Sequence, residues 1–377
     1  MKRKLVISCL AAAMTSAALL PMSASACTRM LWNTDSDFVM VGRNEDYFSA
    51  SAPTLVKTPR GIERKGSVNQ QDNVAEWQVK YGSIVSFANN RFAMDGINEQ
   101  GLTARTLYFD QGETDEHQSD NNKPVLEGDH WVSYVLDNFS TVSDALEGLE
   151  GLRLVSVKGG YSYSASPKHM SIADSTGDSA IIEIQDGEVK VFHGEQYRVM
   201  TNPPNIQTQV EQASKRKIDA NDGTFPNTFS GSDRYQKAQY WLENFPKVKS
   251  TDDINAAYGF MYSALGTTAF VPGTPLPAED AAVGKEIMKH TQSEDSYGVG
   301  TYFQSISDLT NKVYRFKSLL APSDVYVNLS DIDWKTETNV EVIPRIDRHA
   351  QAGLQGDIIG DFQAIEENDI YEQSIVK

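Results

Sequence analysis

A cysteine placed directly behind an N-terminal export signal constrains this chain more than any other feature. Residues 2–4 are all basic, and the segment from Leu5 to Leu20 carries no charge. Pro21 ends that apolar segment, and small residues directly precede Cys27. These three regions match a secretory signal whose cleavage point lies just before the cysteine. Cleavage would therefore turn an internal cysteine into the first residue of the mature chain.

The alternative for this first segment is an uncleaved membrane anchor. Its uncharged run of 16 residues is shorter than the roughly 20 residues that a helix needs to cross a bilayer. We therefore predict that residues 1–26 are a cleaved signal peptide and that residues 27–377 form one domain. The mature protein is expected to be exported, to the periplasm in a Gram-negative bacterium, with no stable membrane insertion after cleavage.

The chain has two cysteines, and Cys9 would leave with the signal. The remaining thiol of Cys27 has no partner for an internal disulfide, so other roles must be considered. A lipoprotein attaches lipid to a cysteine at this position, but its signal normally carries leucine where this chain has Ala24. A residue without function is a second alternative. An N-terminal nucleophile is the third, because an α-amine titrates at about 7.7–8.0 and can act as base for its own thiol.

The charge balance excludes one group of binding functions. The chain holds 51 acidic against 34 basic residues, a formal net charge of −17, and no segment is strongly basic. Binding to nucleic acid or to an anionic membrane needs a positive surface, so we expect neither. The six histidines are scattered without metal-ligand spacing. We therefore expect no metal and no cofactor.

Apolar patterning predicts an α+β fold with mostly antiparallel sheets. Strand-like runs cluster towards both ends of the mature chain and helical periodicity lies between them, unlike a regular β–α alternation. The expected strands are 28–32, 38–41, 84–87, 102–109, 170–173, 180–184, 189–192, 302–305, 313–316 and 325–329. The expected helices are 132–139, a second helix capped by Thr141 and running through Leu149, then 233–242 and 253–263. The polar stretch 110–122 is expected to be an exposed loop.

Motifs in a specific order resemble the choloylglycine hydrolase family, which includes bile salt hydrolases and penicillin V acylases. Cys27 and Thr28 are followed by Gly42-Arg43-Asn44-Glu45-Asp46, which matches the family signature of an N-terminal Cys-Thr pair and Gly-Arg-x-x-Asp. Further segments similar to the family are Asp95–Leu102, Trp131–Ala145, Met200–Pro204, Gly231–Tyr235 and Asn311–Phe316. The resemblance therefore covers nearly the whole mature chain.

The resemblance implies three catalytic residues around the thiol. Cys27 would be the nucleophile with its own α-amine as base. Arg43 would lie beside the sulfur and favour the thiolate, and Asp46 would hydrogen-bond to the α-amine and orient it. Without the resemblance, Arg43 and Asp46 would be interpreted as a structural ion pair at the end of a strand.

Three further residues would act on the substrate carbonyl. The resemblance implies that the side-chain amide of Asn202 and the backbone N–H of Tyr108 stabilise the oxyanion. Arg234 would support charge in the transition state. Taken alone, Asn202 would be a turn residue before two prolines, and Arg234 a solvated charge on a helix.

The family fold implies an architecture and an assembly. It is an N-terminal nucleophile (Ntn) hydrolase fold, an αββα four-layer sandwich in which two antiparallel sheets lie between helical layers. This agrees with the α+β patterning. Members of the family are commonly homotetramers, so the resemblance implies a homotetramer here.

The expected function is an exported amidohydrolase that cleaves a linear amide in a small molecule through an acyl-thioester on Cys27. Tyr108 favours a penicillin V acylase-like enzyme, because tyrosine is found there in penicillin V acylases and asparagine is frequent in bile salt hydrolases. The aromatic candidates for the acyl pocket are Tyr47, Phe48, Phe109, Tyr161 and Tyr163. N-acyl-homoserine lactones and conjugated bile salts present a similar amide, so a conjugated bile salt hydrolase is one alternative. A lipid-anchored periplasmic binding protein, attached through Cys27, is the alternative from another class.

Overall fold

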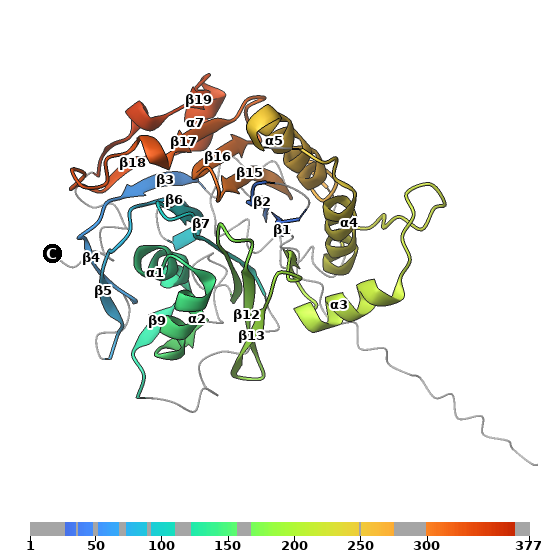
Figure 1. Cartoon of the computed structure of the whole chain (residues 1–377), viewed down its shortest axis with the longest axis horizontal. Coiled ribbons are helices and arrows are strands. Elements are labelled where there is room, and N and C mark those ends of the chain that lie inside the picture. Colours follow the sequence, from blue (N-terminus) through green and yellow to red (C-terminus); the bar gives the residue numbers. More distant parts are fainter. Residues whose placement is uncertain are drawn as a thin grey trace, which may run out of the picture.

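Two large β-sheets stacked face to face form the centre of the molecule (Figure 1). The structure, a computed structural model, describes residues 27–34, 37–47, 52–67, 73–88, 92–109, 122–156, 167–248, 250–274 and 299–365. The predicted signal peptide, residues 110–121 of the predicted loop 110–122 and the candidates Phe48, Tyr161 and Tyr163 lie outside these residues.

The first sheet carries the cysteine at the start of one of its inner strands. In spatial order it contains β14 (Val199–Thr201), β1 (Thr28–Trp32), β2 (Met40–Tyr47), β15 (Gly300–Asp308), β16 (Val313–Ser318), β17 (Val325–Asn328) and β19 (Gly356–Asp357). All neighbouring strands are antiparallel except β17 and β19. Strands β1 and β2 are buried along their whole length, as expected for a sheet covered on both faces.

The second sheet is larger and entirely antiparallel. Its order is β13 (Glu188–His193), β12 (Ser179–Gln185), β11 (Lys168–Ala173), β8 (Thr103–Tyr108), β7 (Phe92–Asn98), β6 (Ser83–Ala88), β3 (Thr54–Thr58), β18 (Glu341–Ile343) and β20 (Gln363–Ala364). Two short pairs complete the strands: β4 (Glu63–Lys65) with β5 (Glu76–Gln78), and β9 (Val125–Glu127) with β10 (Arg153–Val155).

Helices cover the outer face of each sheet. Helices α4 (Gly231–Asn244) and α5 (Ser250–Gly266) lie against the first sheet, and α1 (Trp131–Asn138) lies against the second with α2 (Val142–Glu150) beside it (Figure 1). The other helices of the described residues are α3 (Ile206–Lys215), α7 (Ile346–Gln351) and the 3-10 turns η2 (Gly128–His130), η4 (Leu329–Asp331) and η5 (Ile359–Asp361). This arrangement confirms the predicted αββα architecture.

Three apolar clusters correspond to the three interfaces between these layers. Leu31, Ile84 and Phe303 belong to the cluster between the two sheets. Val132, together with Val135 and Leu136, belongs to the cluster beneath α1, so these apolar residues of the helix expected at 132–139 face the core. Each such fully buried side chain contributes about 1.5–3 kcal/mol. Cys27 itself lies in the third cluster, beneath α4 and α5.

The local predictions are accurate where sequence neighbours decide the structure. Strand β1 has the predicted bounds, and the Thr141 hydroxyl accepts a hydrogen bond from the backbone N–H of Asp144 at 3.1 Å, as predicted for a helix cap. The strand predicted at 38–41 is wrong at both ends, because β2 begins at Met40 and continues through Arg43 to Tyr47. Pairing with β1 and β15 on its two sides extends the strand through a polar segment. The sequence did not predict several of the described elements, among them the strands β3 and β7 and the helix α3.

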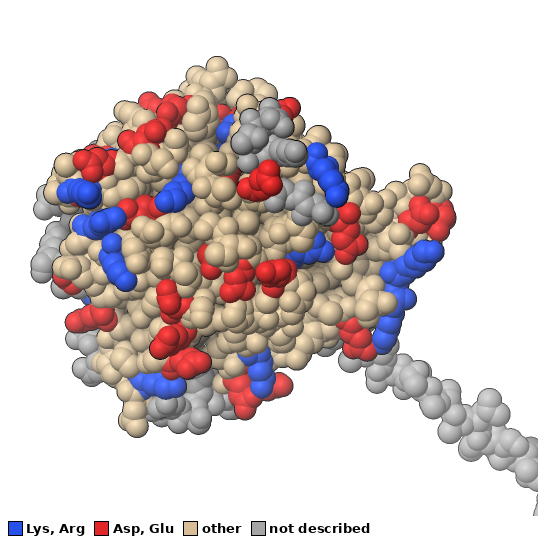
Figure 2. All heavy atoms as spheres, in the orientation of Figure 1, with Lys and Arg blue, Asp and Glu red and all other residues tan. Residues whose placement is uncertain are grey.

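Acidic and basic side chains are interspersed on the face shown in Figure 2, and no continuous basic patch covers the described part of it. Among the described residues, no helix is long and apolar enough to cross a membrane.

Candidate active site

Strand pairing brings the cysteine next to a row of buried polar residues. The register pairs Thr28 with Asn44 and Arg29 with Arg43, so Cys27 lies alongside Glu45. Cys27 is 1% exposed, and none of the four residues from Arg43 to Asp46 exceeds that fraction. Gly42 allows α5 to pack directly on β2, since a Cβ there would lie 2.6 Å from the sulfur of Met261. Polar groups enclosed in this way must find partners inside the protein.

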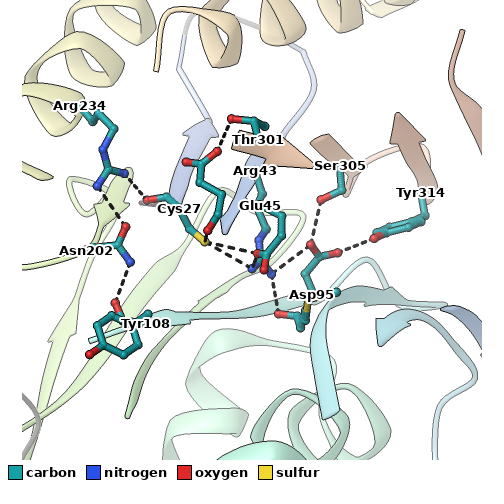
Figure 3. A network of polar contacts seen from close by, with 12 residues as sticks. Cys27, Arg43, Glu45, Asp95, Tyr108, Asn202, Arg234, Thr301, Ser305 and Tyr314 are labelled. Atoms are coloured by element: carbon teal, nitrogen blue, oxygen red, sulfur yellow. Dashed lines mark hydrogen bonds and ion pairs between the residues drawn. The ribbon is translucent and has the colours of Figure 1, made fainter. Parts of the chain in front are cut away.

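The sulfur of Cys27 lies among charged groups (Figure 3). Its Sγ donates to Glu45 Oε2 at 3.3 Å and lies 3.7 Å from the backbone oxygen of Asp46. The Nη2 of Arg43 lies 4.0 Å from Sγ and forms an ion pair with Glu45. The structure therefore brings Arg43 and Asp46 to the thiol, as predicted, and adds a carboxylate that the sequence analysis did not assign.

A second carboxylate holds the other edge of the Arg43 guanidinium. Arg43 Nη1 donates to Asp95 Oδ2 at 3.3 Å and to the Met94 carbonyl at 3.0 Å. Asp95 is 0% exposed and accepts hydrogen bonds from Ser305 Oγ at 2.9 Å and from the Tyr314 hydroxyl at 2.5 Å. Arg43 is therefore fixed between two carboxylates rather than directed at the sulfur alone (Figure 3).

The electrostatic balance at the thiol differs from the simple expectation for a cysteine beside an arginine. Burial raises the pKa of the Cys27 thiol well above its ordinary value, Glu45 raises it further, and Arg43 offsets only part of this. Burial likewise raises the pKa of the Glu45 carboxyl, although Arg43 opposes the shift. In the uncleaved chain, the neighbouring charges therefore favour the neutral form of the Cys27 thiol.

Asp46 lies at the same end of β2 with one free acceptor. Its Oδ1 accepts a hydrogen bond from the Thr301 hydroxyl on β15, and its buried Oδ2 has no hydrogen-bond partner among the described residues. Burial raises the pKa of Asp46 to about 7, with Arg234 opposing the shift. This carboxyl therefore has acceptor capacity close to Cys27 that the described contacts leave unused.

A second network surrounds the carbonyl side of Cys27. Arg234 Nη1 donates to the Cys27 carbonyl oxygen at 2.6 Å and to the Thr28 hydroxyl at 3.0 Å. Its Nη2 donates to Asn202 Oδ1 at 3.1 Å, and Asn202 Nδ2 donates to the Tyr108 carbonyl at 2.8 Å. Burial lowers the pKa of Arg234 to about 10, so the guanidinium stays charged at neutral pH. All six predicted catalytic residues therefore meet at one place.

The start of α4 explains why Arg234 reaches this network. The Ser230 hydroxyl caps the helix by accepting from the N–H of Asp233 at 3.2 Å. A Cβ at Gly231 would clash with the carbonyl oxygens of Asn202 and Pro203, so a glycine is needed for this close approach. Because α4 begins against the Asn202 turn, the guanidinium one turn further on reaches both Asn202 and Cys27.

The predicted acyl-pocket residues have different surroundings. Tyr47 is buried near the thiol, and after burial the groups that raise its pKa are Glu45, Tyr108 and Cys27. Phe109 is fully buried and stacks on His169 with ring centroids 4.7 Å apart, which is a packing role in the core. Two aromatic residues that the sequence analysis did not select, Phe229 and Phe270, pack with their rings tilted and their centroids 4.5 Å apart, and Arg234 lies over the Phe270 ring.

Glu45, Asp95 and Thr301 are the site residues that sequence reasoning missed. Glu45 occupies a variable position of the Gly-Arg-x-x-Asp signature, and Asp95 lies in a motif used only for the resemblance. Glu45 lies two positions after Arg43, so both side chains would be expected on the same face of a strand, but only if β2 had been predicted to continue past Val41. Among the described residues, no group of three or more His, Cys, Asp or Glu side chains is placed to hold a metal ion.

Comparison with known proteins agrees with this fold. Residues 27–340 match the model of the family described as linear amide C–N hydrolases, choloylglycine hydrolase family. The penicillin V acylase of Pectobacterium atrosepticum is 27% identical over 331 residues, which cover 82% of each chain. A conjugated bile acid hydrolase of Lactobacillus gasseri is 24% identical over 270 residues, 66% of this chain and 83% of the relative.

Solved structures show the same architecture. The penicillin V acylase from Agrobacterium tumefaciens superposes with a TM-score of 0.72 at 26% identity, covering 90% of this chain and 98% of that chain. A conjugated bile acid hydrolase from Clostridium perfringens, at 18% identity and a TM-score of 0.65, shares the fold over 84% of this chain and 96% of that chain. The protein has the Ntn-hydrolase fold. It belongs to the choloylglycine hydrolase family and is a hydrolase of linear amide C–N bonds.

Proposed function

We propose that residues 1–26 are removed during export and that Cys27 then acts as the N-terminal nucleophile of a penicillin V acylase-type amidohydrolase. The convergence of Arg43, Asn202 and Arg234 on Cys27 is the observation that carries this proposal (Figure 3). The family match begins at residue 27, which supports a mature chain that starts there.

The reaction begins with transfer of the thiol proton to the free α-amine, which leaves an electron pair on the sulfur for attack on the amide carbonyl. The vacant Oδ2 of Asp46 is the acceptor available to orient that amine. The Asn202 amide and the Tyr108 N–H take the oxyanion role that the family resemblance implies. The protonated amine then donates to the leaving nitrogen, and water hydrolyses the acyl-thioester.

An aromatic or aliphatic acyl group fits the surroundings of the thiol. Tyr47 and Tyr108 lie near Cys27, and Phe229 with Phe270 forms an aromatic pair beside Arg234. Phe229 is 44% exposed, so it is accessible to a ligand. The extent of the similarity to the Pectobacterium penicillin V acylase also favours this substrate class over conjugated bile salts.

Export and assembly complete the proposal. The mature protein is exported, to the periplasm in a Gram-negative host, and its partner is a small acyl amide rather than nucleic acid or a membrane. A homotetramer is proposed from the family resemblance alone. Mass spectrometry of the purified protein tests the first step, because any residue ahead of Cys27 or a lipid on its amine contradicts a free N-terminal nucleophile.

A hydrolysis screen tests the substrate class. Protein produced from the full sequence is assayed with penicillin V, a conjugated bile salt and an N-acyl-homoserine lactone, with Cys27→Ala as the matched control. The proposal predicts the highest kcat/KM with penicillin V and none with the control. A higher value with the bile salt would favour the bile salt hydrolase alternative. Membrane-bound, globomycin-sensitive protein without hydrolysis would favour the lipid-anchored alternative.

A further inference from the structure

Glu45 is a buried carboxylate at the nucleophile to which the proposed mechanism gives no role. Its side chain is 0% exposed, and its Oε2 contacts both the Cys27 sulfur, at 3.3 Å, and the Arg43 guanidinium. Its Oε1 is buried without a hydrogen-bond partner among the described residues. In Figure 3 the carboxylate lies beside the sulfur and the guanidinium.

A purely structural ion pair does not account for this position. Asp95 already supplies one negative charge to Arg43 and is itself held by Ser305 and Tyr314. Glu45 therefore adds a second carboxylate to a single arginine and places that surplus charge against the sulfur. Burying an extra charge costs free energy unless it is fully paired, and Glu45 leaves one oxygen unpaired.

We infer that Glu45 is a positioning residue that holds Cys27 as a neutral thiol, by accepting the S–H hydrogen bond and by occupying the edge of Arg43 that faces the sulfur. This inference rests on the proposed function only in taking Cys27 as the nucleophile. A carboxylate in contact with sulfur opposes the thiolate by like-charge repulsion. An arginine bound to that carboxylate offers the sulfur less of its positive charge.

The consequence is that the Cys27 thiol loses its proton to a positioned base, such as its own α-amine, rather than to solvent. When the proton leaves, the electron pair stays on sulfur and faces a negative carboxylate, so spontaneous ionisation is suppressed. The burial and charge pattern agrees, because Glu45 follows burial among the causes that raise the pKa of Cys27. Loss of the Glu45 charge, with its shape retained, should therefore lower the pKa of the thiol.

Other charged and titratable groups face the same thiol. They are Arg43, Asp46 and Tyr47 on β2 and Arg234 on α4, while Asp95 on β7 acts on Arg43 and Tyr108 on β8 acts on Tyr47. All of them are retained in a Glu45→Gln variant, so a difference from the unchanged protein reports the Glu45 charge. The Gln side chain keeps the size of the original and a carbonyl oxygen that can accept from the thiol.

The test measures ionisation of Cys27 directly. Thiolate absorbance in the ultraviolet is followed against pH in protein made from the full sequence, and the titration of Cys27→Ala is subtracted. The expected result for Glu45→Gln is a midpoint lower by about one pH unit or more, which means about tenfold more thiolate at a pH below both midpoints. An unchanged or higher midpoint in a folded variant overturns the inference.

Two further variants separate contact from general charge. The Asp95→Asn variant also removes a carboxylate from Arg43, but Asp95 does not contact the sulfur. The titration midpoint should therefore move less in Asp95→Asn than in Glu45→Gln. An equal shift in the two variants overturns the direct role of Glu45. Glu45→Asp withdraws the carboxylate by one methylene and should lower the midpoint by a smaller amount. If Glu45→Gln does not fold, an unchanged midpoint in Glu45→Asp overturns the inference.

The titration does not depend on any substrate. Loss of the proposed function would be seen as absence of hydrolysis in the screen, whereas failure of the Glu45 inference would be seen as an unchanged thiol titration in an active enzyme. The two outcomes are therefore distinguishable.

Discussion

The sulfur side and the carbonyl side of Cys27 are built from different chemistry. Around the sulfur, Glu45 and Asp95 share one arginine, so charge dominates. Around the carbonyl, Arg234 donates to the oxygens of Cys27 and Asn202, so directed hydrogen bonds dominate. In the function proposed above, this difference would correspond to a division of roles: the sulfur side would control ionisation of the Cys27 thiol, and the carbonyl side would position the carbonyl group of the substrate.

The largest effect is expected from a substitution of Cys27, the residue that both sides share. Cys27→Ala should lower amide hydrolysis by roughly five orders of magnitude or more, as loss of a nucleophile does elsewhere. The fold should persist, because alanine fits the buried position of Cys27. Steady-state kinetics and a thermal melt measure the two quantities. Retained hydrolysis in the folded variant would refute Cys27 as nucleophile.

The second prediction breaks the carbonyl side alone. Asn202→Ala should lower kcat by about 10²–10³, the usual cost of one oxyanion donor, while the thiol titration midpoint stays unchanged. Asn205→Ala is the matched control, since Asn205 caps α3 by accepting from the Thr208 N–H at 2.9 Å. That control should lose about 1 kcal/mol of stability and keep its kcat. Equal losses of kcat in both variants would contradict the oxyanion role.

The third prediction concerns pH and the end of β2. The pKa of Asp46 is about 7 in the fold against an ordinary value of 3.8, so the native state binds the proton more tightly than the unfolded chain between these values. The free energy of unfolding of the uncleaved chain should therefore fall as pH rises from about 4 to about 7, by on the order of 1 kcal/mol per unit.

The processed protein supplies the comparison for this slope. A free α-ammonium beside Asp46 would stabilise the carboxylate and lower its pKa, so the slope should be smaller in protein that begins at Cys27. Denaturant unfolding at several pH values measures both forms. Identical slopes would contradict the proposed contact between Asp46 and the α-amine.

The smallest expected effect is on stability at the sulfur side. Asp95→Asn keeps the shape of the side chain but weakens its contacts with Arg43, Ser305 and Tyr314. The free energy of unfolding should fall by about 1–3 kcal/mol, with a smaller loss of kcat than in Asn202→Ala. Urea unfolding measures the first quantity. A larger loss of kcat than in Asn202→Ala would contradict the division of roles.

Sequence reasoning succeeded where the physical signal is local. The capping residue Thr141, the apolar spacing of α1 and the strand-like run that forms β1 each depend on neighbours within a few residues. The six predicted catalytic residues came from a family resemblance, which carries tertiary information that composition and periodicity lack. Glu45 and Asp95 were missed, because nothing in the linear sequence shows that these acids share one arginine.

Strand β2 marks the limit most clearly. The segment from Arg43 to Asp46 has the composition of a turn or a surface loop, and its prediction as a strand ended at Val41. Instead, this segment pairs with β1 on one side and β15 on the other, and α5 packs over Gly42, so it is buried. Tertiary pairing therefore decided the structure of the residues that matter most for the site.

The sequence by itself determined the position of the proposed nucleophile. The signal-like segment and the residue after it place a lone thiol at the start of the predicted mature chain, and that depends only on covalent order. Only the tertiary structure decided what surrounds this thiol. Asp95, Asn202 and Arg234 lie far from Cys27 along the chain. Two sheets and the helix α4 converge there, so that Arg234 binds the Cys27 carbonyl, Asn202 binds Arg234, and Asp95 binds the Arg43 that lies beside the sulfur. Because these groups are buried away from water, each charge acts strongly on its neighbours.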